Sequence, residues 1–196
     1  MTDRGTIDVY NARVQDYAKM EPSTTPSDTL AAFIAVLPKG GHVLDLGCGP
    51  GTSARHMVQA GLRVTAMDAS EAMIAVAAQI DGVTARRATF DDLTDVAVYD
   101  GVWANFSLLH APRSDMPKYL SAVHRALKRG GAFHIALKAG EGEERDRIGR
   151  FYTYYTEAEL TGLLQDAGFT TGPYRRGRDK GLSGDDADWI STTAYA

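Results

Sequence analysis

The chain has 196 residues, 44% of them hydrophobic and 23% charged, which is ordinary for a globular domain with a sizeable core. Its formal net charge of −4 argues against the basic surface that nucleic-acid binding requires. The longest apolar run, residues 30–37, is far shorter than the roughly 20 residues of a membrane-spanning helix. We therefore expect one domain over residues 1–196, a monomer or a homodimer, with no nucleic-acid or membrane partner.

Cys48 is the one cysteine of the sequence, so no internal disulfide can form, which fits the reducing cytoplasm. Residues 1–10 contain no apolar core of a secretory signal. A cytoplasmic location is therefore expected. Cys48 itself is either a reactive thiol or, as we favour, a small residue wedged in a tight turn.

An amphipathic helix is predicted over residues 7–20, because Tyr10, Val14 and Tyr17 recur at the i, i+4, i+7 spacing of one helical face. On spacing alone, this stripe fits a helix packed on a core as well as one that covers a ligand.

An apolar strand that runs into a glycine-rich turn is predicted at residues 43–51, with a helix at residues 52–60 behind it. The three glycines of the turn lack a Cβ, so the backbone can take positive φ and approach a ligand closely. The spacing is G-x-G-x-G, and Thr52 stands where a dinucleotide-binding fingerprint has its third glycine. No Gly-Lys-Ser/Thr follows, which excludes a phosphate-binding P-loop.

An acidic residue, Asp68, ends the next predicted strand, about 20 residues after Gly49. An acid at this position can accept both hydroxyls of an adenosine ribose. The alternative is an acid that only interacts with the dipole of the following helix. The pattern favours an adenosine-containing ligand, which dehydrogenases and methyltransferases share.

Strands and helices alternate along the rest of the chain, which is the pattern of a doubly wound α/β sheet. Strands are expected at residues 63–67, 83–90, 99–104, 132–137, 169–174 and 188–195. Helices are expected at residues 28–37, 71–79, 114–129 and 156–167, the third of them closed by Gly130-Gly131. Residues 175–186 are expected to form a hairpin loop.

The run Asp45-Leu46-Gly47-Cys48-Gly49-Pro50-Gly51 resembles the first motif of the class I S-adenosylmethionine-dependent methyltransferases. Residues 99–110 (YDGVWANFSLLH) resemble the fourth motif of a subset similar to the tellurite-resistance-type methyltransferases. That subset also carries a Lys-x-Gly-Glu-Gly and a Gly-Arg-Phe/Tyr-Phe, matched here by residues 138–142 and by Gly149-Arg150-Phe151. The resemblance covers the chain from the N-terminal helix to Trp189.

This resemblance implies a Rossmann-like α/β fold with a doubly wound seven-stranded sheet, mostly parallel with an antiparallel final strand, and helices on both faces. It implies S-adenosylmethionine as cofactor, S-adenosylhomocysteine as product and a small-molecule methyl acceptor. In similar proteins an N-terminal helix covers the cofactor, and the third strand ends beside the adenine. The cofactor-binding residues so implied are Tyr10, Tyr17, Asp45, Gly47, Cys48, Gly49, Asp68, Ala69, Phe90, Asp91, Ala104, Asn105 and Phe106.

Residues 138–155 interrupt the alternation with glycines, charges and a cluster of aromatic residues. This segment is either a solvated loop or a mobile cover of the substrate pocket, since glycines hinge and aromatic side chains exclude water. We divide the domain into an N-terminal helical lid (1–40), a cofactor-binding core (41–138) and a substrate side (139–196). The expected substrate-pocket residues are His110, Arg150, Tyr152 and Tyr154.

Methyl transfer from a sulfonium is an in-line displacement, which needs a positioned nucleophile in a dry pocket more than a catalytic triad. A base is required only where the acceptor must lose a proton. His110 is the candidate, because it follows the fourth strand and titrates near neutrality, and the alternative is a histidine that only packs the turn. Arg150 would suit an anionic acceptor and Glu141 a cationic one. The five histidines show no metal-ligand spacing, so no metal is expected.

Two other functions share these motifs. A protein that binds S-adenosylmethionine without catalysing transfer would keep all of them. A nicotinamide-dependent oxidoreductase shares the strand, turn, helix and ribose acid, although Thr52 and residues 99–110 count against it. The sequence thus predicts an S-adenosylmethionine-dependent methyltransferase that acts on a small molecule.

Overall fold

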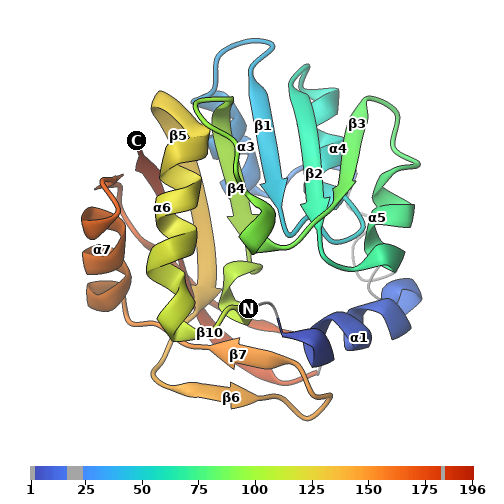
Figure 1. Cartoon of the computed structure of the whole chain (residues 1–196), viewed down its shortest axis with the longest axis vertical. Coiled ribbons are helices and arrows are strands. Elements are labelled where there is room, and N and C mark those ends of the chain that lie inside the picture. Colours follow the sequence, from blue (N-terminus) through green and yellow to red (C-terminus); the bar gives the residue numbers. More distant parts are fainter. Residues whose placement is uncertain (1–2, 17–23, 182–183) are drawn as a thin grey trace.

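The computed structural model describes residues 3–16, 24–181 and 184–196, and its centre is a mostly parallel β-sheet (Figure 1). The strand order is β3-β2-β1-β4-β5-β10-β8, and β9 pairs with β10 outside this path. The sheet strands are β1 (His42–Leu46), β2 (Arg63–Asp68), β3 (Val83–Arg87), β4 (Tyr99–Asn105), β5 (Leu127–Lys138), β8 (Thr170–Thr171), β9 (Arg175–Lys180) and β10 (Asp186–Tyr195). β6 (Glu143–Arg145) and β7 (Phe151–Thr153) form a separate hairpin.

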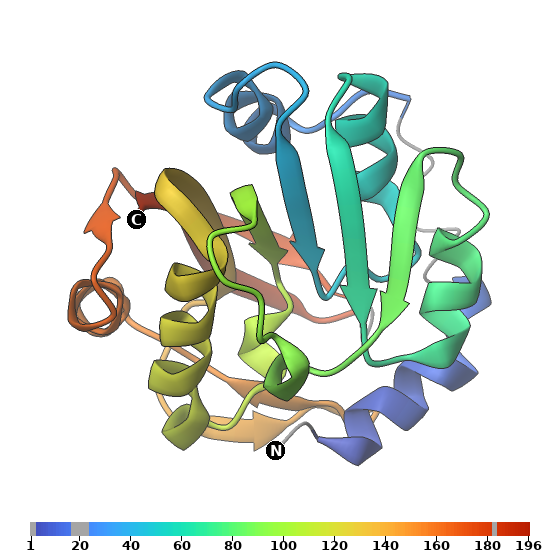
Figure 2. The ribbon, with the colours of Figure 1, turned by 45° about the horizontal axis from the view of Figure 1, so that its top comes forward.

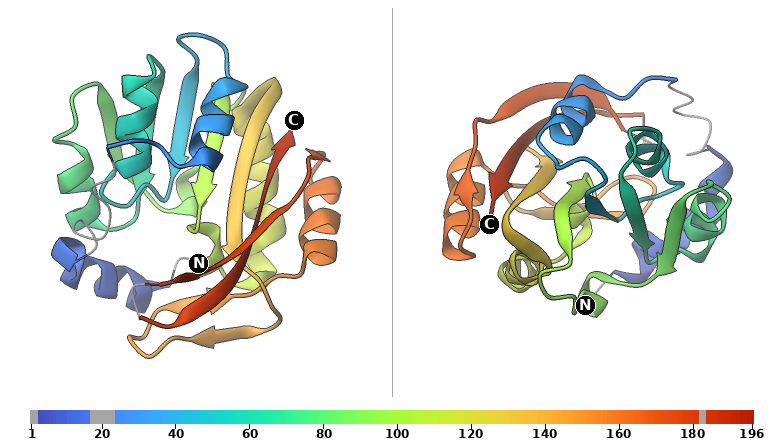
Figure 3. Two further views of the ribbon diagram at one scale, coloured as in Figure 1. Left: turned by 180° about the vertical axis from the view of Figure 1, so that it is seen from behind. Right: turned by 90° about the horizontal axis from the view of Figure 1, so that it is seen from above.

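Helices cover both faces of the sheet (Figures 1 and 3). One face packs against α3, α4 and α5 through residues such as Phe33, Met57 and Ala77, and the other packs against α6 and α7 through Leu120 and Leu164. The helices are α1 (Arg4–Ala12), α3 (Asp28–Ala35), α4 (Thr52–Gln59), α5 (Glu71–Ala77), α6 (Met116–Ala126) and α7 (Glu157–Asp166). The predicted Rossmann-like architecture, with an antiparallel final strand and helices on both faces, is confirmed.

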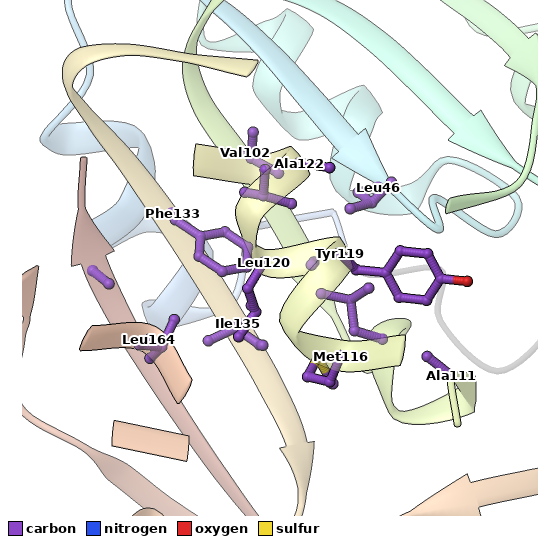
Figure 4. Packing of buried hydrophobic residues seen from close by; sticks show 14 of the residues in the cluster. Leu46, Val102, Ala111, Met116, Tyr119, Leu120, Ala122, Phe133, Ile135 and Leu164 are labelled. Carbon is purple, nitrogen blue, oxygen red and sulfur yellow. The ribbon is translucent and has the colours of Figure 1, made fainter. Parts of the chain in front are cut away.

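Helix α6 anchors the larger part of the hydrophobic core (Figure 4). Its Met116, Tyr119, Leu120 and Val123 recur at helical spacing and are almost free of solvent. Burial of each such side chain contributes about 2 kcal/mol. These contacts fix α6 against β5 and hold the loop between β4 and α6 in place.

Parallel pairing brings the carboxyl ends of β1, β2 and β4 to one edge of the sheet (Figure 2). Leu46 pairs with Met67 of β2, and Asp45 pairs with Trp103 of β4. Segments that the sequence separates by tens of residues therefore leave the sheet side by side, which is where ligands bind in open α/β sheets.

The predicted helix at residues 114–129 is shorter than expected, since α6 ends at Ala126. Leu127 takes an extended backbone (φ −75°, ψ 146°) and pairs with Tyr99 of β4. Gly130 and Gly131 therefore lie in an irregular stretch early in β5 and do not close a helix. Strand pairing outweighs the helix-forming character of this stretch.

Two segments predicted as loops contain strands. Residues 175–180 form β9, whose side chains are mostly exposed, so no apolar alternation reveals it in the sequence. This strand raises the sheet to eight strands, one more than predicted. Residues 138–155 form the β6/β7 hairpin, in which Tyr152 and Tyr155 are buried, so the segment is not a solvated loop.

The predicted N-terminal helix begins at Arg4, earlier than residue 7, and ends at Ala12. Helical backbone resumes at residues 14–16, and the remainder of the predicted helix lies outside the described residues. α1 packs against α5, beside the edge of the sheet where the carboxyl ends of β1, β2 and β4 lie (Figure 2).

Candidate active site

A cavity of about 650 Å³ lies at this edge of the sheet, within the size range of small-molecule sites. We divide it in two. The strand-edge half is lined mainly by Asp45, Leu46, Gly47, Cys48, Gly49, Met67, Asp68, Ala69, Met73 and Phe90. The hairpin half is lined mainly by Tyr10, Phe106, His110, Lys138, Arg150, Tyr152 and Trp189.

Main-chain geometry builds the glycine turn. Gly47 and Gly49 take φ values of 75° and 53°, which L side chains rarely adopt. The amides of Gly47 and Cys48 donate to the Met67 carbonyl oxygen at 2.7 and 3.0 Å. A Cβ on Gly47 would lie 2.2 Å from the Cβ of Ser107, so the turn fits only a glycine there.

Asp68 is fixed beside this turn. The amide of Gly49 donates to Oδ2 of Asp68 at 2.9 Å, and the amide of Ser70 donates to Oδ1 at 2.8 Å. Ser70 also caps α5, since its hydroxyl accepts from the Met73 amide. Burial raises the pKa of Asp68, while these N–H groups oppose the shift. The carboxylate is thus held in one orientation at the carboxyl end of β2.

Two polar atoms lining the strand-edge half have no hydrogen-bond partner among the described residues. They are Oδ2 of Asp45 and Nε1 of Trp103, and both side chains are almost fully buried. Burial, together with the charge of Asp68, raises the pKa of Asp45 to about 7. Unpaired buried polar atoms cost free energy, and these two belong to residues of the cavity wall although the atoms themselves are almost free of solvent contact.

In a dinucleotide-binding turn, the third glycine allows close packing of the helix, and Gly51 allows close packing here. It precedes α4 with φ 86°, and a Cβ there would lie 2.7 Å from Ile80 and 3.2 Å from Ala77. Close packing between the turn and α5 therefore depends on Gly51. Thr52 is the first residue of α4, where a glycine is not required.

In the hairpin half, Arg150 and Tyr10 are hydrogen-bonded to each other. Nη1 of Arg150 donates to the Tyr10 hydroxyl at 3.1 Å, while Nε and Nη2 donate to Asp146 at 2.9 and 2.8 Å. Arg150 and Asp146 are buried, with 3% and 8% of their side chains exposed. The charge of Arg150 is therefore balanced within the chain.

Both ring nitrogens of His110 have partners. Nδ1 lies 2.6 Å from the Phe151 carbonyl oxygen, so Nδ1 carries a proton and donates it. Nε2 then accepts from the Tyr10 hydroxyl at 2.8 Å. Burial lowers the pKa of His110 to about 4, so the ring is neutral at pH 7. No ring nitrogen of His110 is therefore free to take a proton directly from a methyl-accepting substrate.

Helix α1 is fastened over the cavity by these contacts. Besides Tyr10, the Thr6 hydroxyl accepts from the Phe151 amide at 2.9 Å, and the Asp3 carboxylate accepts from Arg145. On the other side, Asn11 accepts from the Ser70 hydroxyl at 2.7 Å. α1 thus bridges the two halves.

Most predicted site residues line the cavity, and three do not. Asp91 is absent from the lining, and its carboxylate is paired with Lys118 and Tyr119. Ala104 is buried in the core, and the hydroxyl of Tyr154 donates to Glu144 at the surface. Tyr17 lies outside the described residues. Predicted residues in the lining are Tyr10, Asp45, Gly47, Cys48, Gly49, Asp68, Ala69, Phe90, Asn105, Phe106, His110, Arg150 and Tyr152.

The residues that line the cavity without having been predicted from the sequence include Trp103, Lys138 and Trp189. Lys138 could have been found, because it is the first polar residue after a buried parallel strand, at the carboxyl end. Trp103 was hidden inside an apolar strand. Trp189 reaches the cavity only through antiparallel pairing with β5, for which no local signal exists.

Within residues 3–16, 24–181 and 184–196, no group of three His, Cys, Asp or Glu side chains is placed to hold a metal ion. No helix in that part of the chain has the length and apolar character to cross a bilayer.

Residues 43–131 match the model of a methyltransferase domain. Over this segment, and in its fold, the chain is similar to the class I S-adenosylmethionine-dependent methyltransferases.

Among particular proteins, the chain is 45% identical over 135 residues to a trans-aconitate 2-methyltransferase of Delftia acidovorans, covering 65% of this chain and 48% of the relative. A malonyl-[acyl-carrier protein] O-methyltransferase of Pseudescherichia vulneris is 33% identical over 101 residues, covering 46% of this chain and 36% of the relative.

Among solved structures, a Burkholderia thailandensis 1,6-didemethyltoxoflavin-N1-methyltransferase with bound 1,6-didemethyltoxoflavin and S-adenosylhomocysteine aligns with a TM-score of 0.72. It is 25% identical, and the alignment covers 96% of this chain and 87% of that one. The chain spans about a third to a half of the length of the first curated relatives.

Proposed function

We propose that the protein is an S-adenosylmethionine-dependent methyltransferase that acts on a small-molecule acceptor by in-line transfer. The observation that carries this proposal is Asp68, held by the Gly49 and Ser70 amides at the mouth of a glycine turn that opens into the cavity. A carboxylate at that place suits the two ribose hydroxyls of an adenosine ligand. The match to a methyltransferase domain and the similar structure with bound S-adenosylhomocysteine support the same cofactor.

The strand-edge half fits this cofactor chemically. Asp68 is the ribose acceptor, Phe90 lines the wall where the adenine would lie, and the unpartnered oxygen of Asp45 is an acceptor for a polar group. The cofactor supplies a sulfonium-bound methyl group when it is present. Tyr10 and the rest of α1 act as the lid of a single-domain enzyme.

The hairpin half positions the acceptor and excludes water. Its aromatic side chains and the buried Arg150–Asp146 pair leave little room for solvent, and orientation of the reactants is the main source of rate for such a displacement. His110 holds Tyr10 and is not a free base, because both of its ring nitrogens are engaged. We therefore assign His110 as a positioning residue.

Isothermal titration with S-adenosylmethionine, S-adenosylhomocysteine and NADH tests the proposal. We expect micromolar binding of the first two and none of NADH. Asp68→Ala should weaken S-adenosylhomocysteine binding more than tenfold, because a charged hydrogen-bonding partner is removed. Asp81→Ala, which changes an exposed acid outside the cavity, is the matched control.

Three outcomes would count against the proposal. Unchanged affinity in Asp68→Ala would remove the ribose assignment, and NADH binding would favour an oxidoreductase. Tight cofactor binding with no S-adenosylhomocysteine formed across a broad acceptor panel would favour a binding protein without catalysis.

A further inference from the structure

We propose that Lys138 binds a carboxylate group of the methyl acceptor. This inference rests on the proposed function and names the substrate class of that site. It follows from the position of Lys138, from the charges around it and from the shape of the hairpin half.

Lys138 is placed to meet a ligand. It is the last residue of β5, at the carboxyl end, and lines the cavity. Its ammonium nitrogen lies 3.8 Å from the centre of the Tyr152 ring, a cation–π contact that orients the side chain. Burial, and after it the nearby charge of Arg150, lower the pKa of Lys138, which indicates a cation short of compensating negative charge.

The carboxylates near Lys138 already have other partners. Asp146 is bound by Arg150, Glu144 accepts from the Tyr154 hydroxyl at 2.6 Å, and Asp185 lies 3.3 Å from Arg147. No ion pair joins Lys138 to an acid within the described ranges. Arg150 lines the same half but is neutralised by Asp146. Among the described residues of the lining, Lys138 and Lys180 are cations without an ion pair, and Lys138 is the one in contact with the Tyr152 ring.

Aromatic side chains set the shape of the acceptor. The rings of Phe106 and Trp189 meet edge to face, with centroids 6.2 Å apart, and Tyr152 lies beneath Lys138. Phe106 takes φ 56°, a strained value for a non-glycine residue, and strain of this kind gathers at ligand sites. One positive charge among flat rings suits a singly charged group on a planar, unsaturated body. A phosphate, with more charge, would lack partners.

The test compares acids with their uncharged amides. Probes are benzoate with benzamide and trans-cinnamate with trans-cinnamamide, titrated into the full chain with and without saturating S-adenosylhomocysteine. We expect at least one acid to bind about tenfold or more tighter than its amide, as a hydrogen bond between charged groups predicts. Lys138→Met should reduce that preference to within twofold, and Lys138→Arg should retain most of it.

Lys39→Met is the matched control, because Lys39 is exposed in the turn before β1, at the opposite end of the strand from the glycine turn. It should keep the acid preference of the wild type. All these variants should bind S-adenosylhomocysteine within twofold of wild type, which shows that each is folded.

The proposal is overturned if no acid binds, if acids and amides bind equally, or if the preference survives in Lys138→Met. Failure of the wild type to bind S-adenosylhomocysteine would instead defeat the proposed function. The preference for acids over amides, measured without S-adenosylhomocysteine, would still show whether Lys138 binds a carboxylate.

Discussion

The hydrogen bonds that fix the strand-edge half of the cavity differ in kind from those that fix the hairpin half. In the strand-edge half, amides of Gly47, Cys48 and Gly49 fix the turn and Asp68. In the hairpin half, side chains from distant segments meet, as Tyr10 does with His110 and Arg150. The geometry of the strand-edge half therefore depends on residues that lack a Cβ. The geometry of the hairpin half depends on polar and charged side chains.

The largest effect should come from adding a methyl group to the glycine turn. Gly47→Ala places a Cβ 2.2 Å from that of Ser107, in a backbone with φ 75°, and should cost more than about 4 kcal/mol of unfolding free energy. Gly61→Ala is the control, because Gly61 has φ 83° but no atom within 4 Å of the added carbon. It should cost only about 1 kcal/mol. Urea denaturation measures both, and equal losses would refute the role of the contact with Ser107.

The next effect tests the side-chain half. Arg150→Met leaves Asp146 buried without its cation and should cost about 3 kcal/mol in urea denaturation. Arg147→Met removes a comparable ion pair with Asp185 in which both side chains are more than 60% exposed, 63% and 64%, so it should cost about 0.5 kcal/mol or less. Similar losses in the two variants would mean that burial of the Arg150 pair contributes nothing special.

The smallest effect depends on pH and concerns Asp45, whose pKa is raised to about 7. The folded state keeps this proton up to about pH 7, whereas the unfolded chain loses it near pH 4. The stability it contributes is therefore complete below about pH 4 and is lost as the pH rises toward 7. Asp45→Asn, which mimics the protonated form, should match wild type at pH 4 and be more stable than wild type at pH 8.

Asp100→Asn is a control of opposite sign. Although burial works against it, hydrogen bonds from Lys128 and the His42 amide hold the pKa of Asp100 below its ordinary value. This variant should be less stable than wild type at pH 8, and the difference should shrink in acid. Thermal melts at several pH values measure both variants, and parallel curves for Asp45→Asn and wild type would contradict the assignment. Asp45→Asn should also weaken S-adenosylmethionine binding, because it alters a buried hydrogen-bond acceptor in the wall of the cavity.

The strand-edge half could be predicted because its information is local. A run of seven residues, Asp45 to Gly51, carries both the strand end and the glycines, and Asp68 follows at the distance that one helix and one strand require. The structure joins Gly49 and Asp68 by a hydrogen bond. Backbone conformation depends on near neighbours, so sequence motifs report it well.

Which charge of the hairpin half remains unpaired was decided by tertiary structure. The sequence proposed Arg150 or Glu141 as the charge that faces an acceptor, yet Arg150 is paired with Asp146 and Glu141 lies outside the cavity. Lys138 becomes available only because nearby acids are taken by other side chains, and no spacing rule reports such pairing.

By itself, then, the sequence determined the alternating sheet, the glycine turn and the acid that follows it, because local spacing and the absence of a Cβ dictate them. Only the folded chain decided which charges remain unpaired in the cavity. The reason is physical: a charge is available to a ligand only after every competing partner, near or far in the sequence, has been placed.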